Sequence, residues 1–298
     1  MTLFEQAGTV ISILLSSFLP ALANPPGAVR SPEPALVPLA EVAPFPTKRE
    51  PAIAPLIQAK SAMAVDLPSN ASLYEKESDQ PVPIASITKL MTALLVAERT
   101  KPDDIITVPK HGTTSEESQM GLLEGEQLRA DDLMAGLLIQ SANDAAVALA
   151  EQVAGSQEAF TKQMNERASA MGLRQTRFSN PSGYDKTEDD SYSTARELSV
   201  LARASIAEPR IRALVALKEA TVKTVGGRDI SLNTTNSLLG TYLPIGGLKT
   251  GTTDEAGPCL VSWVNSGDRQ LLAVVLNSPD RFQESKSILD WSLRSYRW

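Results

Sequence analysis

Strand-like runs stand at both ends of the folding part of this chain, and helix-like sequence fills the interval between them. Residues 59–67 and 71–78 read as a hairpin of two strands, and from about residue 219 strand-like runs alternate with glycine turns. Strands so far apart in sequence can share one sheet only if the helices between them form an insertion. We therefore predict an α/β (α+β) fold, in which one antiparallel sheet is built from both chain ends, with flanking helices and a mostly helical subdomain at about 100–218.

The side chains available for chemistry narrow the classes of function. The 298 residues carry 28 basic and 35 acidic side chains, a net charge of −7, and no basic cluster, so no nucleic-acid partner is expected. The single cysteine, Cys259, cannot form an internal disulfide, and the single histidine, His111, cannot supply a His-rich metal site. We expect no cofactor and no metal. Catalysis must then rest on serine, lysine, asparagine and carboxylates.

The first 56 residues differ in amino-acid composition from the rest of the chain. Residues 7–23 are uncharged and mostly apolar and end in Ala-Leu-Ala, so residues 1–23 are predicted to be an export signal peptide or an N-terminal membrane anchor. The absence of lysine and arginine before this segment argues against the usual orientation and leaves its cleavage open. Residues 24–56 are rich in proline and are predicted to be a semi-rigid linker, which leaves 57–298 as the folded domain. We expect an exported protein of the cell envelope, periplasmic or extracytoplasmic.

A serine and a lysine are spaced one helical turn apart near the start of an amphipathic helix. Ser86 and Lys89 are three positions apart, so the amine can reach the hydroxyl. A serine becomes a good nucleophile when a neighbouring base takes its proton, and a lysine is such a base when desolvation or a second cation disfavours its charged form. Lys249 is a candidate for that second cation. A lone Ser-x-x-Lys is more often a helix cap and a solvated lysine, so this pair needs support from other motifs.

Two further motifs supply that support. Ser141-Ala142-Asn143 falls at a predicted junction between helices, and Lys249-Thr250-Gly251 falls in a predicted strand. Each alone is usually a cap or an exposed strand edge. Together with Ser86 and Lys89 they form, in order, the S-x-x-K, S-D-N and K-T-G set of penicillin-binding proteins and class A β-lactamases.

The chain from about residue 58 to 298 resembles the low-molecular-mass penicillin-binding proteins of the D-alanyl-D-alanine carboxypeptidase family, serine peptidase family S11. The resemblance extends beyond the motifs to residues 120–156, 164–185 and 193–202. It implies a β-lactamase/transpeptidase-like fold. It also implies a serine-type D-Ala-D-Ala carboxypeptidase that acts on peptidoglycan stem peptides and is inhibited by β-lactam antibiotics.

The resemblance also assigns roles to individual residues. Ser86 would attack the carbonyl between two D-alanines and become acylated, Lys89 would act as its base, and Ser141 would relay a proton. The backbone N–H groups of Ser86 and Thr252 would form the oxyanion hole, while Arg281 would hold the terminal carboxylate. The substrate-binding residues implied in this way are Asn143, Lys249, Thr250, Gly251, Thr252 and Arg281.

Three alternatives stay open. A DD-endopeptidase of peptidoglycan cross-links uses nearly the same site, and in lacking a β-rich second domain and a C-terminal anchor the sequence is similar to that shorter branch; loops 101–125 and 184–193 are expected to decide. A serine β-lactamase would need a base for deacylation, and Glu188 is the nearest substitute for the class A glutamate. A wall-binding module with a dead site is disfavoured because every required side chain is present. His111 is expected on the surface, Cys259 in the interior, and Trp291 and Trp298 against the last helix.

Overall fold

The computed structural model describes residues 45–298, with gaps at 111–116, 185–190, 242 and 268. The predicted signal segment, residues 24–44 of the predicted linker, His111 and Glu188 therefore lie outside the described residues. None of the helices in the described part of the chain has the length and apolar character that crossing a bilayer requires.

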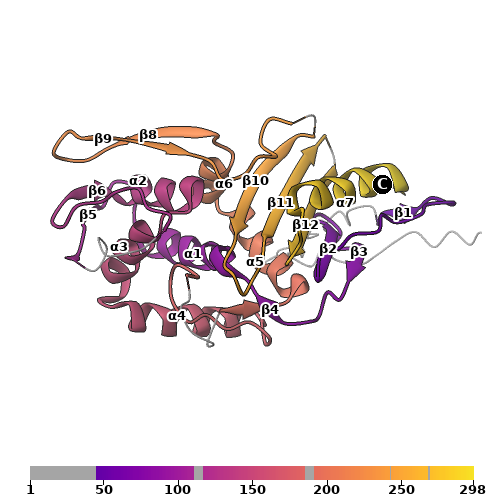
Figure 1. The fold of residues 1–298 in the computed structure, drawn as a ribbon, viewed down its shortest axis with the longest axis horizontal. Coiled ribbons are helices and arrows are strands. Elements are labelled where there is room, and N and C mark those ends of the chain that lie inside the picture. The colour runs from indigo at the N-terminus through magenta and orange to yellow at the C-terminus, as the bar shows by residue number, and fades with distance from the viewer. Residues whose placement is uncertain (1–44, 111–116, 185–190, 242, 268) are drawn as a thin grey trace, which may run out of the picture. The chain divides into compact units, whose positions relative to one another are not determined.

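A five-stranded antiparallel sheet joins the two ends of the domain, as the sequence predicts (Figure 1). β12 from the C-terminal part pairs with β2 from the N-terminal part, in a register that places Val274 opposite Met63. The strands, in spatial order, are β10 (Ile245–Gly251), β11 (Cys259–Ser266), β12 (Arg269–Leu276), β2 (Ser61–Asp66) and β3 (Ser72–Lys76).

Helices cover both faces of this sheet because successive side chains of a strand point to opposite faces. Odd-numbered residues of β12, from Leu271 to Val275, share a core with α7 (Arg281–Ser295). Even-numbered residues, from Leu272 to Leu276, share a second core with α1 (Lys89–Arg99) and with helices of the insertion that follows it. The helices of the insertion are α2 (Ala130–Ala135), α3 (Asn143–Ala154), α4 (Gln157–Ala170), α5 (Ala195–Ala207) and α6 (Pro209–Val215).

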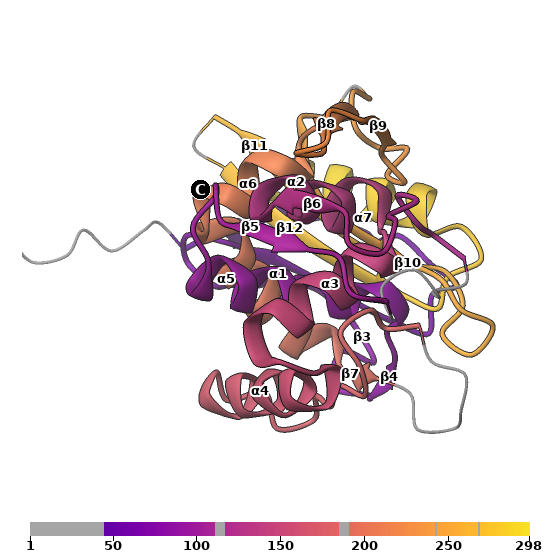
Figure 2. The ribbon, with the colours of Figure 1, turned by 90° about the vertical axis from the view of Figure 1, so that its left-hand side faces the viewer.

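Two short strand pairs lie on the helical side of the main sheet (Figure 2). β5 (Ile105–Thr107) pairs with β6 (Gln127–Arg129), and β8 (Glu219–Lys223) pairs with β9 (Asp229–Asn233). The β8–β9 pair is a separate two-stranded sheet, because its buried residues pack against the helices and the other face alternates to solvent. The strand-like sequence that begins near residue 219 therefore forms a hairpin on the helical side. The C-terminal strands of the main sheet begin only at β10.

The end of the predicted linker lies against the domain. β1 (Thr47–Lys48) pairs with β13 (Tyr296–Arg297), and the backbone N–H of Arg49 donates to Ser295 O at 2.8 Å. Further along, Lys76 Nζ donates to Ile57 O at 2.8 Å. Residues 47–57 are therefore tied to the last residues of the chain and to β3, while a linker boundary at residue 56 stays a prediction.

Candidate active site

Ser86 lies on a tight turn just before α1. The chain leaves β4 (Val82–Pro83), passes through a 3₁₀ turn, η1 (Ala85–Thr88), and enters α1 at Lys89, three residues later than the sequence indicates. In a 3₁₀ turn, side chains three apart eclipse one another, and Lys89 Nζ accordingly lies 2.9 Å from Ser86 Oγ. Ala85 has φ +47°, a left-handed conformation that costs a non-glycine residue free energy and that such turns at functional sites often retain.

Lys89 is fully buried and its amine is surrounded by oxygen atoms. Besides Ser86 Oγ, Nζ lies 2.7 Å from Asn143 Oδ1 and 2.6 Å from the carbonyl oxygen of Ser182. The two carbonyl-type oxygens can only accept hydrogen bonds, whereas a serine hydroxyl can either donate or accept. A neutral amine can donate its two N–H groups to those carbonyls and keep its lone pair for the hydroxyl proton of Ser86.

The turn that contains Ser182 was not predicted as part of the site. Asn180 Oδ1 accepts hydrogen bonds from the backbone N–H groups of Ser182 and Gly183, which fixes the turn. Gly183 has φ +68°, and a Cβ on it would lie 2.0 Å from Ala85 O, so only glycine allows this close approach. Ser182 contributes its backbone carbonyl, which any residue type could supply, so the identity of residue 182 does not reveal this contact. The Asn-Pro-x-Gly sequence of residues 180–183 predicts a turn but not its role.

Ser141 is positioned by an irregular helix end. The π-helical turn η3 (Gly136–Gln140) stops at Ser141, whose φ is +64°, and α3 begins at Asn143. This break directs Ser141 Oγ to Lys249 Nζ, 2.8 Å away, and Asn143 Oδ1 to Lys89. The predicted junction between helices is therefore a left-handed break that presents both side chains to the lysines.

The third motif lies on β10, at one edge of the main sheet. Lys249 is almost fully buried, and its Nζ also bonds to Thr250 O at 2.8 Å. A Cβ on Gly251 would lie 3.0 Å from the backbone nitrogen of Ser86, so glycine lets the end of the strand approach the turn that carries Ser86. Arg281, at the start of α7, donates to Gly251 O at 2.7 Å and to Thr252 Oγ1 at 2.6 Å.

Burial and crowding of positive charge dominate the electrostatics. Desolvation, reinforced by the charges of Lys89 and Arg281, holds the pKa of Lys249 well below its usual value. Burial likewise lowers the pKa of Arg281. Cys259 is buried as predicted, and desolvation raises its pKa to about 11, which keeps the thiol protonated.

A cavity of about 180 Å³ opens where the three motifs meet. Lys89 and Lys249 lie buried behind its wall. Glu117, Ser118 and Tyr184 fall in the loops 101–125 and 184–193 that were expected to decide substrate preference, although none of the three was singled out. The contribution of Thr235 was not predicted. The described residues that line the cavity are Ser86, Glu117, Ser118, Ser141, Asn143, Gly183, Tyr184, Thr235, Thr250, Gly251, Thr252, Thr253 and Arg281.

Remaining expectations concern residues away from this cavity. Trp291 packs edge-on to Tyr74 and Tyr296, with ring centroids 6.1 and 5.8 Å apart, and Trp298 lies 6.4 Å from Tyr296. The two tryptophans thus pack α7 and the chain end, away from the described lining of the cavity. Within the described ranges, no group of three or more His, Cys, Asp or Glu residues is arranged to hold a metal ion.

This combination of fold and site defines the class of penicillin-recognising serine enzymes. A single-residue mutant of the Streptomyces K15 DD-transpeptidase superimposes with a TM-score of 0.76 and 29% identity, covering 80% of this chain and 99% of that one. Penicillin-binding protein D2 from Listeria monocytogenes, in its ampicillin-bound form, gives a TM-score of 0.71 and 29% identity, covering 80% and 98%.

Sequence relatives define the family within this class. The model of the S11 peptidases, described as D-alanyl-D-alanine carboxypeptidase, matches residues 48–280, and the chain belongs to that family. It is 36% identical to the D-alanyl-D-alanine carboxypeptidase DacC of Escherichia coli, over 82% of this chain and 63% of that protein. It is 32% identical to DacF of Bacillus subtilis, over 80% and 63%. The chain thus spans less than two thirds of the length of these relatives.

Proposed function

We propose that this chain is a serine-type D-alanyl-D-alanine carboxypeptidase that cleaves peptidoglycan stem peptides through an acyl-enzyme on Ser86. The observation that carries the proposal is the surroundings of Lys89 Nζ. Two of its neighbours are carbonyl-type oxygens that can only accept, and the third is the Ser86 hydroxyl at 2.9 Å. That arrangement suits a neutral amine acting as general base.

Acylation follows from this geometry. Ser86 Oγ attacks the carbonyl carbon between the two D-alanines while its proton passes to Lys89 Nζ. The carbonyl oxygen becomes an oxyanion, for which the backbone N–H groups of Ser86 and Thr252 are the proposed donors. The C–N bond then breaks, a proton goes to the leaving D-alanine, and the acyl group stays on Ser86 as an ester that water later hydrolyses.

The second wall of the cavity supplies the leaving-group proton and the binding contacts. Ser141 Oγ lies 2.8 Å from Lys249 Nζ, so the two can relay a proton to the departing amine. The substrate backbone is proposed to add as a strand beside β10 at Thr250 and Gly251, with Asn143 contacting its amide. Arg281 is proposed to bind the terminal carboxylate, which would exchange with its present bonds to Gly251 O and Thr252 Oγ1.

Release of D-alanine from an acyl-D-Ala-D-Ala peptide tests this proposal. We expect release by the wild type and none by Ser86→Ala. The matched control is Ser231→Ala, which removes an exposed hydroxyl on β9, outside the cavity. Release by Ser86→Ala at the rate of the control would reject Ser86 as the nucleophile.

A DD-endopeptidase is the second candidate. The observation that favours it is a relative from Pseudomonas aeruginosa named D-alanyl-D-alanine endopeptidase, 34% identical over 73% of this chain and 71% of that protein. Both reactions acylate the same serine and differ in the leaving group. Mass spectrometry of purified muropeptides separates them, because a carboxypeptidase removes one alanine from a monomer and an endopeptidase splits a cross-linked dimer.

Binding of β-lactams is proposed on the same machinery. The solved structures of the Listeria relative with ampicillin and with cefotaxime support it. A long-lived acyl-enzyme is expected; rapid penicillin turnover would instead indicate a β-lactamase, and no reaction at all would indicate a binding module.

From the sequence we also propose a location in the cell envelope. In this proposal, residues 1–23 are a signal or membrane tether, residues 24–56 are a linker and residues 57–298 are the catalytic domain. Mass analysis of the mature N-terminus tests cleavage of the first segment.

A further inference from the structure

One wall of the cavity is a strap, residues 117–122, that is fixed to the start of α3. The carboxylate of Asp144 is buried and accepts hydrogen bonds from the backbone N–H groups of Met120 and Leu122, each at 3.1 Å. The backbone N–H of Asn143 donates to Ser118 O at 2.7 Å. Because Asn143 and Asp144 are consecutive, the strap is held in register with the site residue that contacts Lys89.

Glu117 lines the cavity at the N-terminal end of this strap. Its carboxylate is exposed to solvent, and it makes no hydrogen bond or ion pair with another residue of the described chain. Among the described residues that line the cavity, Glu117 is the one acidic residue and Arg281 is the one basic residue. The cavity thus offers one group for an anion and one group for a cation.

These two charges lie beside different walls. Arg281 bonds to Gly251 O and Thr252 Oγ1, at the end of β10. Glu117 precedes Ser118, whose Oγ donates to Gln140 O at 2.7 Å and whose carbonyl accepts from Asn143, on the opposite wall. A peptide with its terminal carboxylate at Arg281 therefore directs its acyl portion, and not its leaving group, toward Glu117.

We propose that Glu117 is a specificity residue that binds a protonated primary amine on the side chain of the residue preceding D-Ala-D-Ala. This inference rests on the proposed function and names the substrate class that the site prefers. An ammonium group and a carboxylate form a charge-assisted hydrogen bond, and the open mouth lets a flexible side chain reach it. The same group also offsets the repulsion that an amine meets from Arg281, the positively charged side chain that lines the cavity.

Two peptides that differ only in this amine test the inference. Each ends in lysyl-D-Ala-D-Ala with a blocked α-amine; in one the lysine side-chain amine is free, and in the other it is acetylated. We expect the wild type to favour the free amine by about twofold to tenfold in kcat/KM, a range typical of a partly solvated charged contact. Because the contact forms in the bound substrate, the difference should appear mainly in KM.

Glu117→Gln should reduce this ratio to about one. The matched control is Glu124→Gln, which removes the same charge from an exposed residue seven positions further on that does not line the cavity. The control should keep the wild-type ratio. Raising the salt concentration should reduce the ratio in the wild type and leave it near one in Glu117→Gln.

The outcomes separate the two proposals. If the wild type hydrolyses neither peptide, the carboxypeptidase proposal fails. If it hydrolyses both with equal kcat/KM, or if Glu117→Gln keeps the wild-type ratio, the role of Glu117 is rejected while the carboxypeptidase proposal stands.

Discussion

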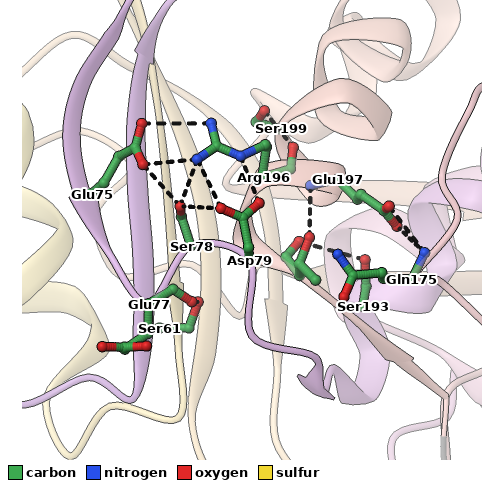
Figure 3. A network of polar contacts seen from close by, with 11 residues as sticks. Ser61, Glu75, Glu77, Ser78, Asp79, Gln175, Ser193, Arg196, Glu197 and Ser199 are labelled. Carbon is green, nitrogen blue, oxygen red and sulfur yellow. Dashed lines mark hydrogen bonds and ion pairs between the residues drawn. The ribbon is translucent and has the colours of Figure 1, made fainter.

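The site around the cavity and the junction between β3 and α5 both contain charged or chargeable side chains, yet these are arranged in opposite ways. At the junction, Arg196 of α5 bonds to Asp79 at 2.7 Å and to Glu75 at 2.8 Å, and Ser78 joins the same network (Figure 3). Opposite charges meet there near solvent. Behind the cavity wall, two lysines lie buried, Lys89 bonded to Ser86 and Lys249 bonded to Ser141, and no carboxylate is bonded to either in the contacts named above.

The pKa values of the charged groups shift in opposite senses at the two places: toward the charged form at the junction and toward the neutral form behind the cavity wall. Hydrogen bonds from Ser72 and Arg196 lower the pKa of Glu75, and Arg196 lowers that of Asp79, so the junction favours the charged forms. Burial lowers the pKa of Lys249, so the cavity disfavours the charged form. The junction adds a little stability, whereas the site gives up stability by burying an amine whose charged form is disfavoured.

Removing Lys89 tests the cavity with the largest expected effect. Lys89→Ala should lower the rate of penicillin acylation by about 10²- to 10⁴-fold, the range typical of losing a general base. Stopped-flow or gel-based labelling with a fluorescent penicillin measures it. Lys162→Ala, at an exposed site on α4, is the control and should acylate normally. An acylation rate near that of the control, in a Lys89→Ala protein that still unfolds cooperatively, would contradict the role of Lys89 as base.

Close backbone packing of Gly183 against the turn that carries Ser86 predicts the next largest effect, which is a loss of stability. Gly183→Ala would place a Cβ against Ala85 O in a left-handed conformation, and we expect it to lower the free energy of unfolding by about 3 kcal/mol. Gly227→Ala has the same backbone problem, at φ +91°, but no atom within 4 Å, so about 1 kcal/mol is expected there. Urea denaturation compares them. Equal losses would show that the approach of Gly183 to Ala85 is not tight.

The lowered pKa of Lys249 predicts a pH dependence in the alkaline range. The unfolded chain binds the Lys249 proton up to its ordinary pKa near 10.4, whereas the native protein has already lost it at lower pH. The stability of the wild type relative to Lys249→Met should therefore rise with pH between those two values, by at most about 1.4 kcal/mol per pH unit. Urea denaturation between pH 7 and about 10.4 measures this difference. A difference that stays constant would show that Lys249 is not desolvated.

The junction predicts the smallest effect, in the acid range. Arg196→Met should lower the free energy of unfolding by about 1 kcal/mol or less, because the contacts are partly exposed. The native carboxyl of Glu75 has a lowered pKa, so the wild-type advantage should be present above the ordinary pKa and be lost as pH falls through the lowered one. Added salt should reduce it as well. An effect as large as that of Gly183→Ala would mean that the junction carries more of the stability than its exposure suggests.

The sequence predicted the features that depend on residue identity. Strand-like runs between turn residues located β2, β3, β11 and β12, and because strands at both ends needed partners, the shared sheet followed. The three motifs that contain Ser86, Lys89, Ser141, Asn143 and Lys249 could be assigned to one site because they occur in a specific order. The structure brings them together around one cavity.

Features that depend on backbone geometry were not predicted. The carbonyl of Ser182 reaches Lys89 from 93 residues away, and any residue type could supply it. The 3₁₀ turn at Ser86 and the left-handed Ser141 depend on packing against Gly183 and β10, which periodicity does not report. Glu117 reaches the cavity because Asp144, 27 positions later, binds the strap that carries it. Such contacts become visible only once the chain is folded.

Intact-protein mass spectrometry after brief exposure to a penicillin tests the central claim most directly. The wild type should gain the mass of one penicillin, with the added mass on the peptide that contains Ser86, and Ser86→Ala should gain none. Addition to another residue of the wild type, or equal addition to Ser86→Ala, would contradict the account of a serine activated by its neighbouring lysine.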